Sequence, residues 1–220
     1  MTLGELMAQF RADVDDAKAP PLWSDASVIR WMNEAEQEAC RRSELLIDST
    51  TVALTPVTAV AADAWVAYDP RIVAVKRARP QGQYPIPVIT AKEMDGYQNW
   101  EDETGPLLRA LVSDMATFKF RTYPVLTANA TIDLTVQRLP LADMVEPEED
   151  SPEIAVVYHL KLLHWVKHRA YSVDDVDAND PRLASKYEAD FIREFGTATA
   201  RQEAWIRAHG GRDPVTGTFA

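Results

Sequence analysis

Residues 131–138 read Thr-Ile-Asp-Leu-Thr-Val-Gln-Arg, and this octapeptide is the clearest strand signal in the 220-residue chain. Its apolar side chains alternate with polar ones, so Ile132, Leu134 and Val136 share one face of the strand. Alternation of this kind is typical of an antiparallel sheet with one buried face and one solvated face. The octapeptide therefore predicts such a sheet around it.

Further short β-type runs precede the octapeptide, and Pro, Gly, Asn and Asp residues separate them. The predicted strands cover residues 51–54, 65–68, 72–77, 86–89, 108–112 and 117–122, and a short helix covers 91–98. We therefore expect a β-rich module over residues 49–144.

Two helices are predicted before this module. Thr2 and Glu5 fit a capping box at the start of the first helix, which the proline pair at 20–21 stops. Ser24 is the N-cap of a second helix that is expected to run to about residue 48. The solvated side of this second helix is predicted to carry Glu34, Glu36, Glu38, Arg41 and Arg42.

Two more helices are predicted after the module. Ser151-Pro152-Glu153 has the order N-cap, first-turn proline and acid, which is typical of a helix start. Asp180-Pro181 gives a second start, for a helix of about 28 residues by the same capping rule. The buried side of the third helix is predicted to contain Ile154, Val157, Tyr158, Leu162, Trp165 and Val166.

The predicted fold class is α+β, with four main helices packed together and an inserted antiparallel β-rich module. A lone helix pair buries its apolar stripe poorly, so residues 1–48 and 151–209 are expected to form one helical bundle. The inserted module covers residues 49–144, an acidic linker covers 145–150, and a flexible C-terminal tail covers 210–220.

Composition narrows the class of protein. The net charge of −11 and the pI of about 4.8 argue against a protein that wraps DNA or RNA, because phosphate binding depends on Lys and Arg. Cys40 is the only cysteine, so no internal disulfide forms and a reducing compartment is expected. The N-terminus does not resemble a signal peptide, and no apolar run has the ~20 residues of a membrane helix.

No established catalytic motif is present, and we expect no catalytic, cofactor-binding or metal-binding residues. His164 and His168 are four residues apart on a helix, but no third ligand completes a metal site, so we interpret them as surface or interface histidines. Residues 175–179 imitate the first five positions of a calcium-binding EF-hand loop. Asp180 and Lys186 stand at the sixth and twelfth positions, where that loop requires Gly and Glu, so we interpret the segment as an acidic turn.

Both helical ends resemble a known family. Leu22-Trp23-Ser24-Asp25 and residues 29–35 resemble the opening of tailed-bacteriophage head-to-tail adaptors, also called head-completion, gatekeeper or tail tubular proteins. The resemblance continues in residues 158–165, Arg169-Ala170-Tyr171, Asp174, Asp175, Asp177 and residues 191–196. It implies a structural protein of the virion that forms a ring, usually of twelve subunits, beneath the portal protein. Such a ring extends the DNA channel and docks the tail at the capsid–tail junction, after assembly in the host cytoplasm.

The resemblance also implies contact sites. The C-terminal tail is expected to reach the portal, with Arg207, Arg212, Asp213, Val215 and Phe219 as contact candidates. Candidates for a contact with the tail or a neighbouring subunit are Trp100, Glu101 and Asp102, although the Trp100 ring would equally fit against its own sheet. Candidates for the lumen, where acid would keep DNA from sticking, are Glu146, Glu148, Glu149, Asp174 and Asp175, which would equally fit a solvated outer face.

Two alternative functions remain. One is another virion component, such as a tail terminator or a baseplate protein. The other is a small metal-dependent hydrolase that uses His164 and His168 or the acidic linker.

Overall fold

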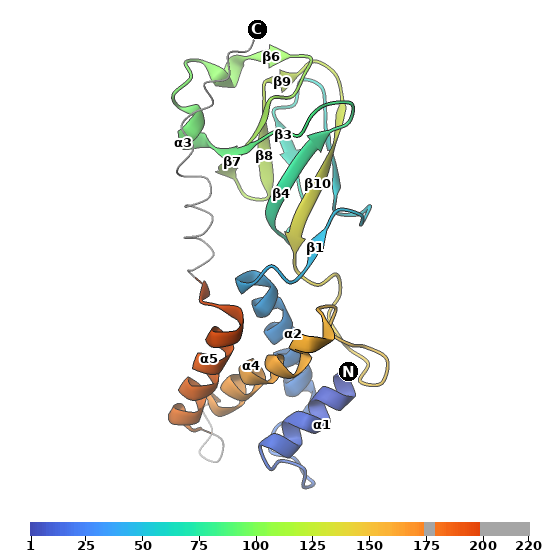
Figure 1. The fold of residues 1–220 in the computed structure, drawn as a ribbon, viewed down its shortest axis with the longest axis vertical. Coiled ribbons are helices and arrows are strands. Elements are labelled where there is room, and N and C mark those ends of the chain that lie inside the picture. Colours follow the sequence, from blue (N-terminus) through green and yellow to red (C-terminus); the bar gives the residue numbers. More distant parts are fainter. Residues whose placement is uncertain (174–178, 199–220) are drawn as a thin grey trace. The chain divides into compact units, whose positions relative to one another are not determined.

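The computed structural model describes residues 1–173 and 179–198, and the chain divides into two units (Figure 1). The helical unit contains Met1–Leu46 and the chain from Leu139 to the end of the last described helix. The β unit contains Ile47–Arg138. The fold is therefore mixed α+β, and the chain passes from the helical unit to the β unit and back.

The helical unit is built from four helices around one apolar core. They are α1 (Leu3–Asp13), α2 (Asp25–Arg42), α4 (His159–Tyr171) and α5 (Pro181–Phe195), and the 3-10 turn η2 (Val156–Tyr158) precedes α4. Helix α4 contacts each of the other three. The core includes Leu6, Phe10, Trp31, Met32, Leu162, Val166, Phe191 and Phe195.

Three of the predicted helix starts are confirmed. Ser24 is the N-cap of α2, and its side chain accepts the N–H group of Ser27. Thr2 and Glu5 form the capping box of α1, with both reciprocal hydrogen bonds in place. Asp180 caps α5, and Pro181 occupies its first turn. The expected 28-residue helix is interrupted, because α5 ends at Gly196, whose φ of 84° is incompatible with a right-handed helix.

Two other helix boundaries were predicted wrongly. Helix α2 ends at Arg42 instead of near residue 48, because Ser43 is extended and its hydroxyl donates to the carbonyl of Phe195. Helix α4 begins at His159 instead of near residue 152. Residues 151–155 are irregular and residues 156–158 form η2, in which Val157, expected to be buried, is exposed.

The β unit contains ten short strands. They are β1 (Ile47–Asp48), β2 (Pro56–Ala59), β3 (Trp65–Ala67), β4 (Ile72–Pro80), β5 (Val88–Thr90), β6 (Thr104–Gly105), β7 (Ala110–Ala116), β8 (Lys119–Tyr123), β9 (Val125–Leu126) and β10 (Ala130–Arg138). The unit also contains the short helix α3 (Ala91–Met94) and the 3-10 turn η1 (Trp100–Asp102).

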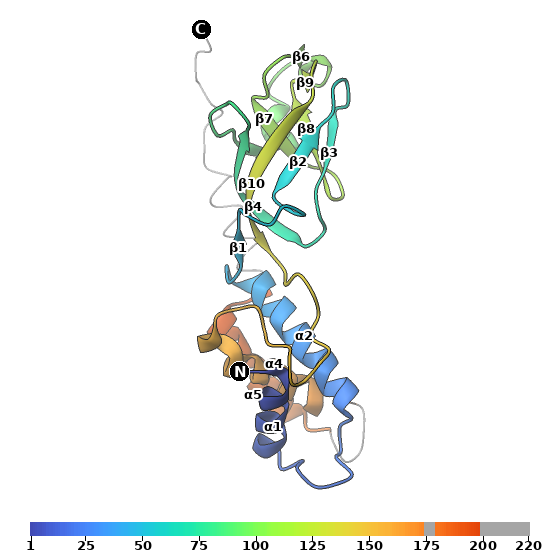
Figure 2. The same cartoon turned by 90° about the vertical axis from the view of Figure 1, so that its right-hand side faces the viewer.

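Strand β10, which contains the octapeptide, is the centre of the first sheet (Figure 2). It pairs antiparallel with β4 along one side and with β1 and β2 along the other. Ile132, Leu134 and Val136 are buried in the core of the unit, as their alternation predicts. The second sheet has the order β3-β8-β7-β5, and β6 pairs with β9. The β5–β7 and β6–β9 pairs are parallel, so the expectation of a wholly antiparallel module is corrected.

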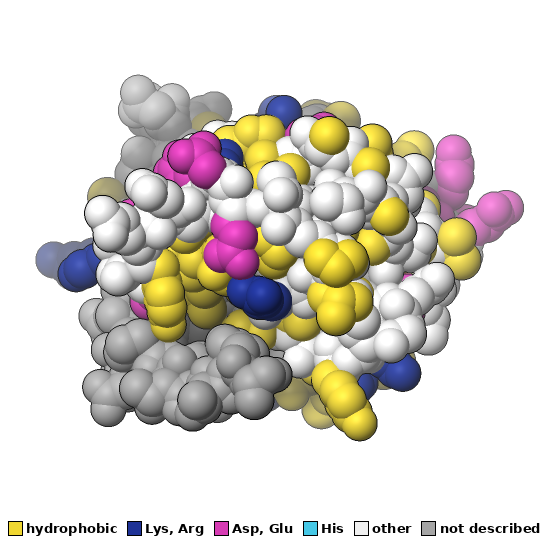
Figure 3. All heavy atoms as spheres, turned by 90° about the horizontal axis from the view of Figure 1, so that it is seen from above, with side chains coloured by type: hydrophobic (Ala, Val, Ile, Leu, Met, Phe, Trp, Pro, Cys, Tyr) yellow, Lys and Arg dark blue, Asp and Glu magenta, His cyan; other side chains and the backbone are white. Residues whose placement is uncertain are grey.

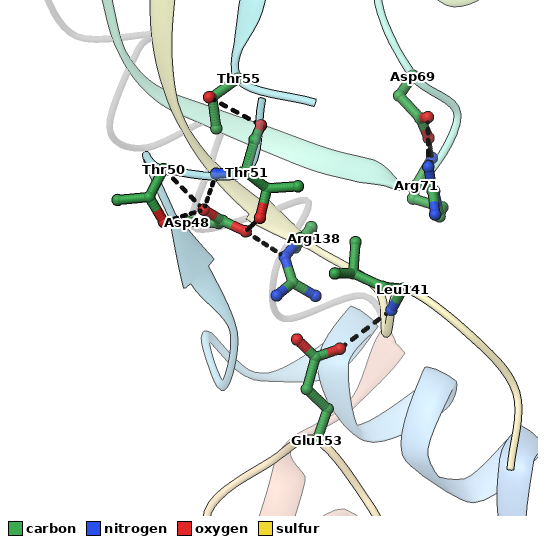
Figure 4. A network of polar contacts seen from close by, with 9 residues as sticks. All are labelled: Asp48, Thr50, Thr51, Thr55, Asp69, Arg71, Arg138, Leu141 and Glu153. Atoms are coloured by element: carbon green, nitrogen blue, oxygen red, sulfur yellow. Dashed lines mark hydrogen bonds and ion pairs between the residues drawn. The ribbon is translucent and has the colours of Figure 1, made fainter. Parts of the chain in front are cut away.

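A buried ion pair ties together the two strands through which the chain enters and leaves the β unit. In these strands, β1 and β10, Asp48 lies opposite Val136, and the guanidinium of Arg138 donates to the Asp48 carboxylate at 2.7 Å (Figure 4). The same carboxylate accepts the backbone N–H groups of Thr50 and Thr51 and the Thr51 hydroxyl. Burial alone would raise the pKa of Asp48, but these hydrogen bonds hold it well below its usual range.

Candidate functional site

An irregular segment of the helical unit, residues 141–155, is held firmly against α2, and we call it the strap. The side chain of Asn33 exchanges two hydrogen bonds with the backbone of Met144, at 2.8 and 2.9 Å. Gln37 donates to the carboxylate of Asp143 at 2.9 Å. The strap therefore has a defined backbone path, although it contains no regular secondary structure.

Glu36 is the third anchor of the strap on α2, and its side chain is buried. One of its oxygens accepts the backbone N–H groups of Glu153 at 2.6 Å and Ile154 at 3.2 Å. Burial raises the pKa of Glu36 to about 7, against the opposite effect of the two donors. The sequence places Glu36 on the solvated side of its helix, and no local signal reveals a partner that lies more than a hundred residues away.

The strap also caps the start of α1. The N–H groups of Leu3 and Gly4 donate to the carbonyls of Asp150 and Pro147, both at 2.8 Å. These donors have no partner inside the helix, so the strap satisfies them. A Cβ on Gly4 would lie 3.0 Å from the Pro147 carbonyl oxygen, which explains why the smallest residue stands there.

The acidic side chains of the strap have two different roles. The Asp150 carboxylate accepts the N–H groups of Val145 and Glu146, and these bonds lower its pKa. Glu146, Glu148 and Glu149 instead point to solvent. These three lumen candidates therefore form an exposed acidic surface, whereas Asp174 and Asp175 lie outside the described residues.

Apolar side chains are exposed beside this acidic surface. Leu141, Val145, Val156, Val157 and Leu160 have between 38% and 68% of their surface in solvent, and we call them the apolar ridge. An open groove of about 600 Å³ lies beside Val145, between the strap and α2. Clustered exposed apolar side chains often mark contact sites for other proteins.

The end of the β unit that carries β6 and β9 has few charged residues, and we call it the tip. Hydrophobic and uncharged side chains dominate this face (Figure 3). Residues 80–91, 104–108 and 122–130 contain no Lys, Arg, Asp or Glu. Val60 and Leu107 are about half exposed there. The tip therefore suits a contact with protein better than a contact with nucleic acid.

Trp100 is packed into the β unit, as the second of the two interpretations of its loop predicts. Only 6% of its surface is exposed, and its ring meets that of Tyr123 edge-on at a centroid distance of 6.3 Å. The guanidinium of Arg121 lies 5.4 Å from the centre of the Trp100 ring. The expectation of an exposed tryptophan is corrected, and Glu101 and Asp102 are the exposed members of this candidate set.

The candidate residues for metal binding or nucleophilic chemistry are hydrogen-bonded or buried within the helical unit. His168 Nδ1 hydrogen-bonds to the carbonyl of Ala184 at 3.0 Å, and burial lowers the pKa of His164. Cys40 is a buried thiol in the core. Within residues 1–173 and 179–198, no three His, Cys, Asp or Glu side chains are close enough to hold a metal ion together.

Several expected features lie outside the described residues. They are the EF-hand-like segment, apart from its last residue, and the portal-contact candidates Arg207, Arg212, Asp213, Val215 and Phe219. In the part of the chain that the structure describes, every helix is too short or too polar to cross a membrane.

Comparison with known families identifies the class of protein. Residues 1–213 match the family described as SU10 adaptor protein, and this match includes all described residues of both units. No curated protein matches the chain. The chain belongs to the SU10 adaptor protein family, which is a family of structural phage head-to-tail adaptors.

Proposed function

We propose that the protein forms a homo-oligomeric ring beneath the portal, with twelve subunits as in the adaptors it resembles. The ring extends the DNA channel and docks the tail or nozzle protein at the capsid–tail junction. DNA passes through without specific binding, and the protein has no catalytic step. Membership of the adaptor family supports this proposal more than any other observation.

The surfaces of the two units suit such a protein. A closed ring of identical subunits needs heterologous contacts, in which one face of a subunit meets a different face of its neighbour. The helical unit offers the apolar ridge, and the β unit offers the uncharged tip. These faces differ in chemistry and belong to separate units, so one chain can bind two kinds of protein.

The remaining site assignments belong to the same proposal. Glu146, Glu148 and Glu149 are exposed, and acid at these positions would repel DNA from a channel wall. The C-terminal candidates, from Arg207 to Phe219, contact the portal. Glu101 and Asp102 contact the tail or a neighbouring subunit.

Negative-stain microscopy of the purified protein mixed with the portal of the same phage tests the proposal. We expect a ring that extends the narrow end of the portal. Free portals beside unattached small particles would refute the proposal. Binding to tail tubes without binding to the portal would support the alternative of a terminator or baseplate protein.

A truncated chain that ends at residue 198 tests the role of the C-terminal segment. We expect it to unfold in urea as cooperatively as the full chain and to lose portal binding. Undiminished portal binding by the truncated chain would remove Arg207, Arg212, Asp213, Val215 and Phe219 from the contact surface.

A further inference from the structure

The negative charge of the protein is concentrated in one unit. Residues 47–138 contain nine Lys or Arg and ten Asp or Glu, so the β unit is almost neutral. Residues 1–46 and 139–198 together contain eleven Lys or Arg and twenty-two Asp or Glu. Copies of the helical unit therefore repel one another. An assembly of many copies is more stable if the acidic side chains of this unit contact basic side chains.

The β unit carries a row of cations on strand β4, namely Lys76, Arg77 and Arg79, which we call the basic stripe. All three side chains are exposed. Arg77 and Arg79 are two residues apart on a strand, so they project from the same face. Their partners on β10 in the pairing register are Thr135 and Asp133.

The two arginines of the basic stripe are not engaged in ion pairs with any described residue. The Arg79 guanidinium donates to the backbone carbonyl of Gln83 at 3.3 Å, which keeps its charge available. Arg77 makes no hydrogen bond within the described chain. Strand β4 pairs with β10 on one side, and among the described residues its other side has a single bridge, from Ala78 to Ile86, so the stripe lies on an edge of the described sheet.

The exposed acids of the strap are also without ion-pair partners in the described chain. Glu146, Glu148 and Glu149 lie within four residues, and the anchors on α1 and α2 fix the backbone that carries them. The strap therefore presents three negative charges on a held backbone, and such charges attract a cationic surface without a large cost of ordering.

We propose that the basic stripe of one copy docks on the strap acids of a second copy. This inference rests on the proposed ring, and it assigns the faces that neighbouring subunits use. Because stripe and strap belong to different units of the same chain, every copy carries one of each, which is the arrangement that a head-to-tail ring requires. Exposed ion pairs contribute only about 0.2–1 kcal/mol each, so these charges select the partner face and its register, and apolar contacts add affinity.

Two other interpretations of the basic stripe make different predictions. Cations on an edge strand also prevent unwanted strand pairing, but any charge serves that purpose, whatever its sign. A DNA-binding stripe would need more cations than three, and Asp133 stands opposite Arg79 in the sheet. A second copy of the acidic helical unit is therefore the better partner.

Charge reversal on the two faces tests the proposal. The stripe variant carries Arg77→Glu and Arg79→Glu, and the strap variant carries Glu148→Lys and Glu149→Lys. Each variant alone has like charges on both faces, so we expect at least a tenfold loss in the apparent affinity for ring formation on the portal. An equimolar mixture restores both contacts in alternating order, and we expect rings that contain both variants. A matched control, Lys92→Glu with Lys119→Glu, changes the net charge of the β unit equally and should assemble like the wild type.

The outcomes separate this inference from the proposed function. If the wild-type protein forms no ring on the portal, the proposed function itself fails. If wild type and both variants form rings equally well, the ring stands and the assigned faces are wrong. Failure of the mixture to recover, with both variants folded by circular dichroism, would refute the inference. If the wild type binds duplex DNA and the stripe variant does not, the basic stripe is a contact site for nucleic acid and the inference is refuted.

Discussion

Replacing Glu36 by glutamine removes a buried charge from the helical unit and keeps an oxygen that accepts the N–H groups of Glu153 and Ile154. Burial raises the pKa of Glu36 from 4.5 to about 7 in the folded protein. Below pH 4.5 the carboxyl is protonated in both the folded and the unfolded state. Between pH 4.5 and 7 the unfolded state loses the proton and the folded state keeps it, so the free energy of unfolding falls as the pH rises.

The size of this effect follows from the same pKa values. A shift of one pKa unit corresponds to 1.36 kcal/mol, so the wild type loses about 3 kcal/mol of stability from this group by pH 8. Glu36→Gln does not titrate and avoids that loss. We therefore expect the difference in unfolding free energy between Glu36→Gln and wild type to grow by about 3 kcal/mol from pH 4 to pH 8.

Urea unfolding followed by far-UV circular dichroism at a series of pH values measures this difference, because the helix signal reports mainly on the helical unit. Glu149→Gln is the matched control, since it makes the same change on an exposed part of the strap. We expect its difference from wild type to stay constant within about 0.5 kcal/mol over the same range. A Glu36→Gln difference that is equally flat would show that Glu36 does not titrate between pH 4 and 8, and would refute the reasoning.

Three further substitutions test other parts of the fold. Asp48→Ala removes the carboxylate to which the buried Arg138 guanidinium donates and should cost about 3 kcal/mol of β-unit stability by urea unfolding. The wild-type contribution should disappear only as the pH falls below 3.8, since the folded pKa of Asp48 lies lower still. Trp100→Ala should lower the stability of the β unit by about 3 kcal/mol in the same assay, because it leaves the site of a buried ring empty. The control Tyr84→Ala, at a residue that is 91% exposed, should change the stability by less than about 0.5 kcal/mol. Equal losses would contradict the burial of Trp100. Gly4→Ala should lower the melting temperature, and should lower the free energy of unfolding by about 1 kcal/mol, because the added Cβ meets a carbonyl of the strap. An increase in the free energy of unfolding would show that the strap moves aside at that point.

The parts of the fold that the sequence predicts correctly depend on local interactions. The capping box of Thr2 and Glu5 and the Asp180-Pro181 start of α5 involve residues that are close in sequence. The alternation of β10 is likewise a property of one strand with one buried face. Such signals survive because the tertiary structure agrees with them.

Two of the wrong predictions involve partners that are far away in the sequence. Ser151-Pro152-Glu153 has the residues of a helix start, but α4 begins at His159, and the N–H groups of residues 153 and 154 donate to Glu36 on α2. Residues 47–48 were assigned to a helix, but they pair with β10 as β1. The expected strand at 51–54 is a turn, in which Leu54 and Thr55 donate N–H groups to the carbonyl of Thr51. The partners of residues 47–48 and 153–154 lie on distant segments that no local motif marks, whereas local hydrogen bonds close the turn at 51–54.

The candidate surfaces were predictable only in part. The acidity of residues 146–149 is visible in the sequence, but the anchors that hold the strap come from α1 and α2, more than a hundred residues away. The basic stripe alternates with Ala78 on β4, and sequence alone does not show that this strand lies on a sheet edge. For Trp100 the sequence left exposure and packing equally open, because its neighbours are acidic and its ring fits its own sheet, and the β unit buries it.

The pairing of β1 with β10 brings the two ends of the β unit close together. Its first residue, Ile47, lies opposite Gln137, one residue before its last, so its two ends are about 5 Å apart. A short turn is enough to bridge that gap, and a different domain whose termini are adjacent fits into the same opening. The β unit can therefore be removed or exchanged as one piece of chain without changing the sequence order of the surrounding helices.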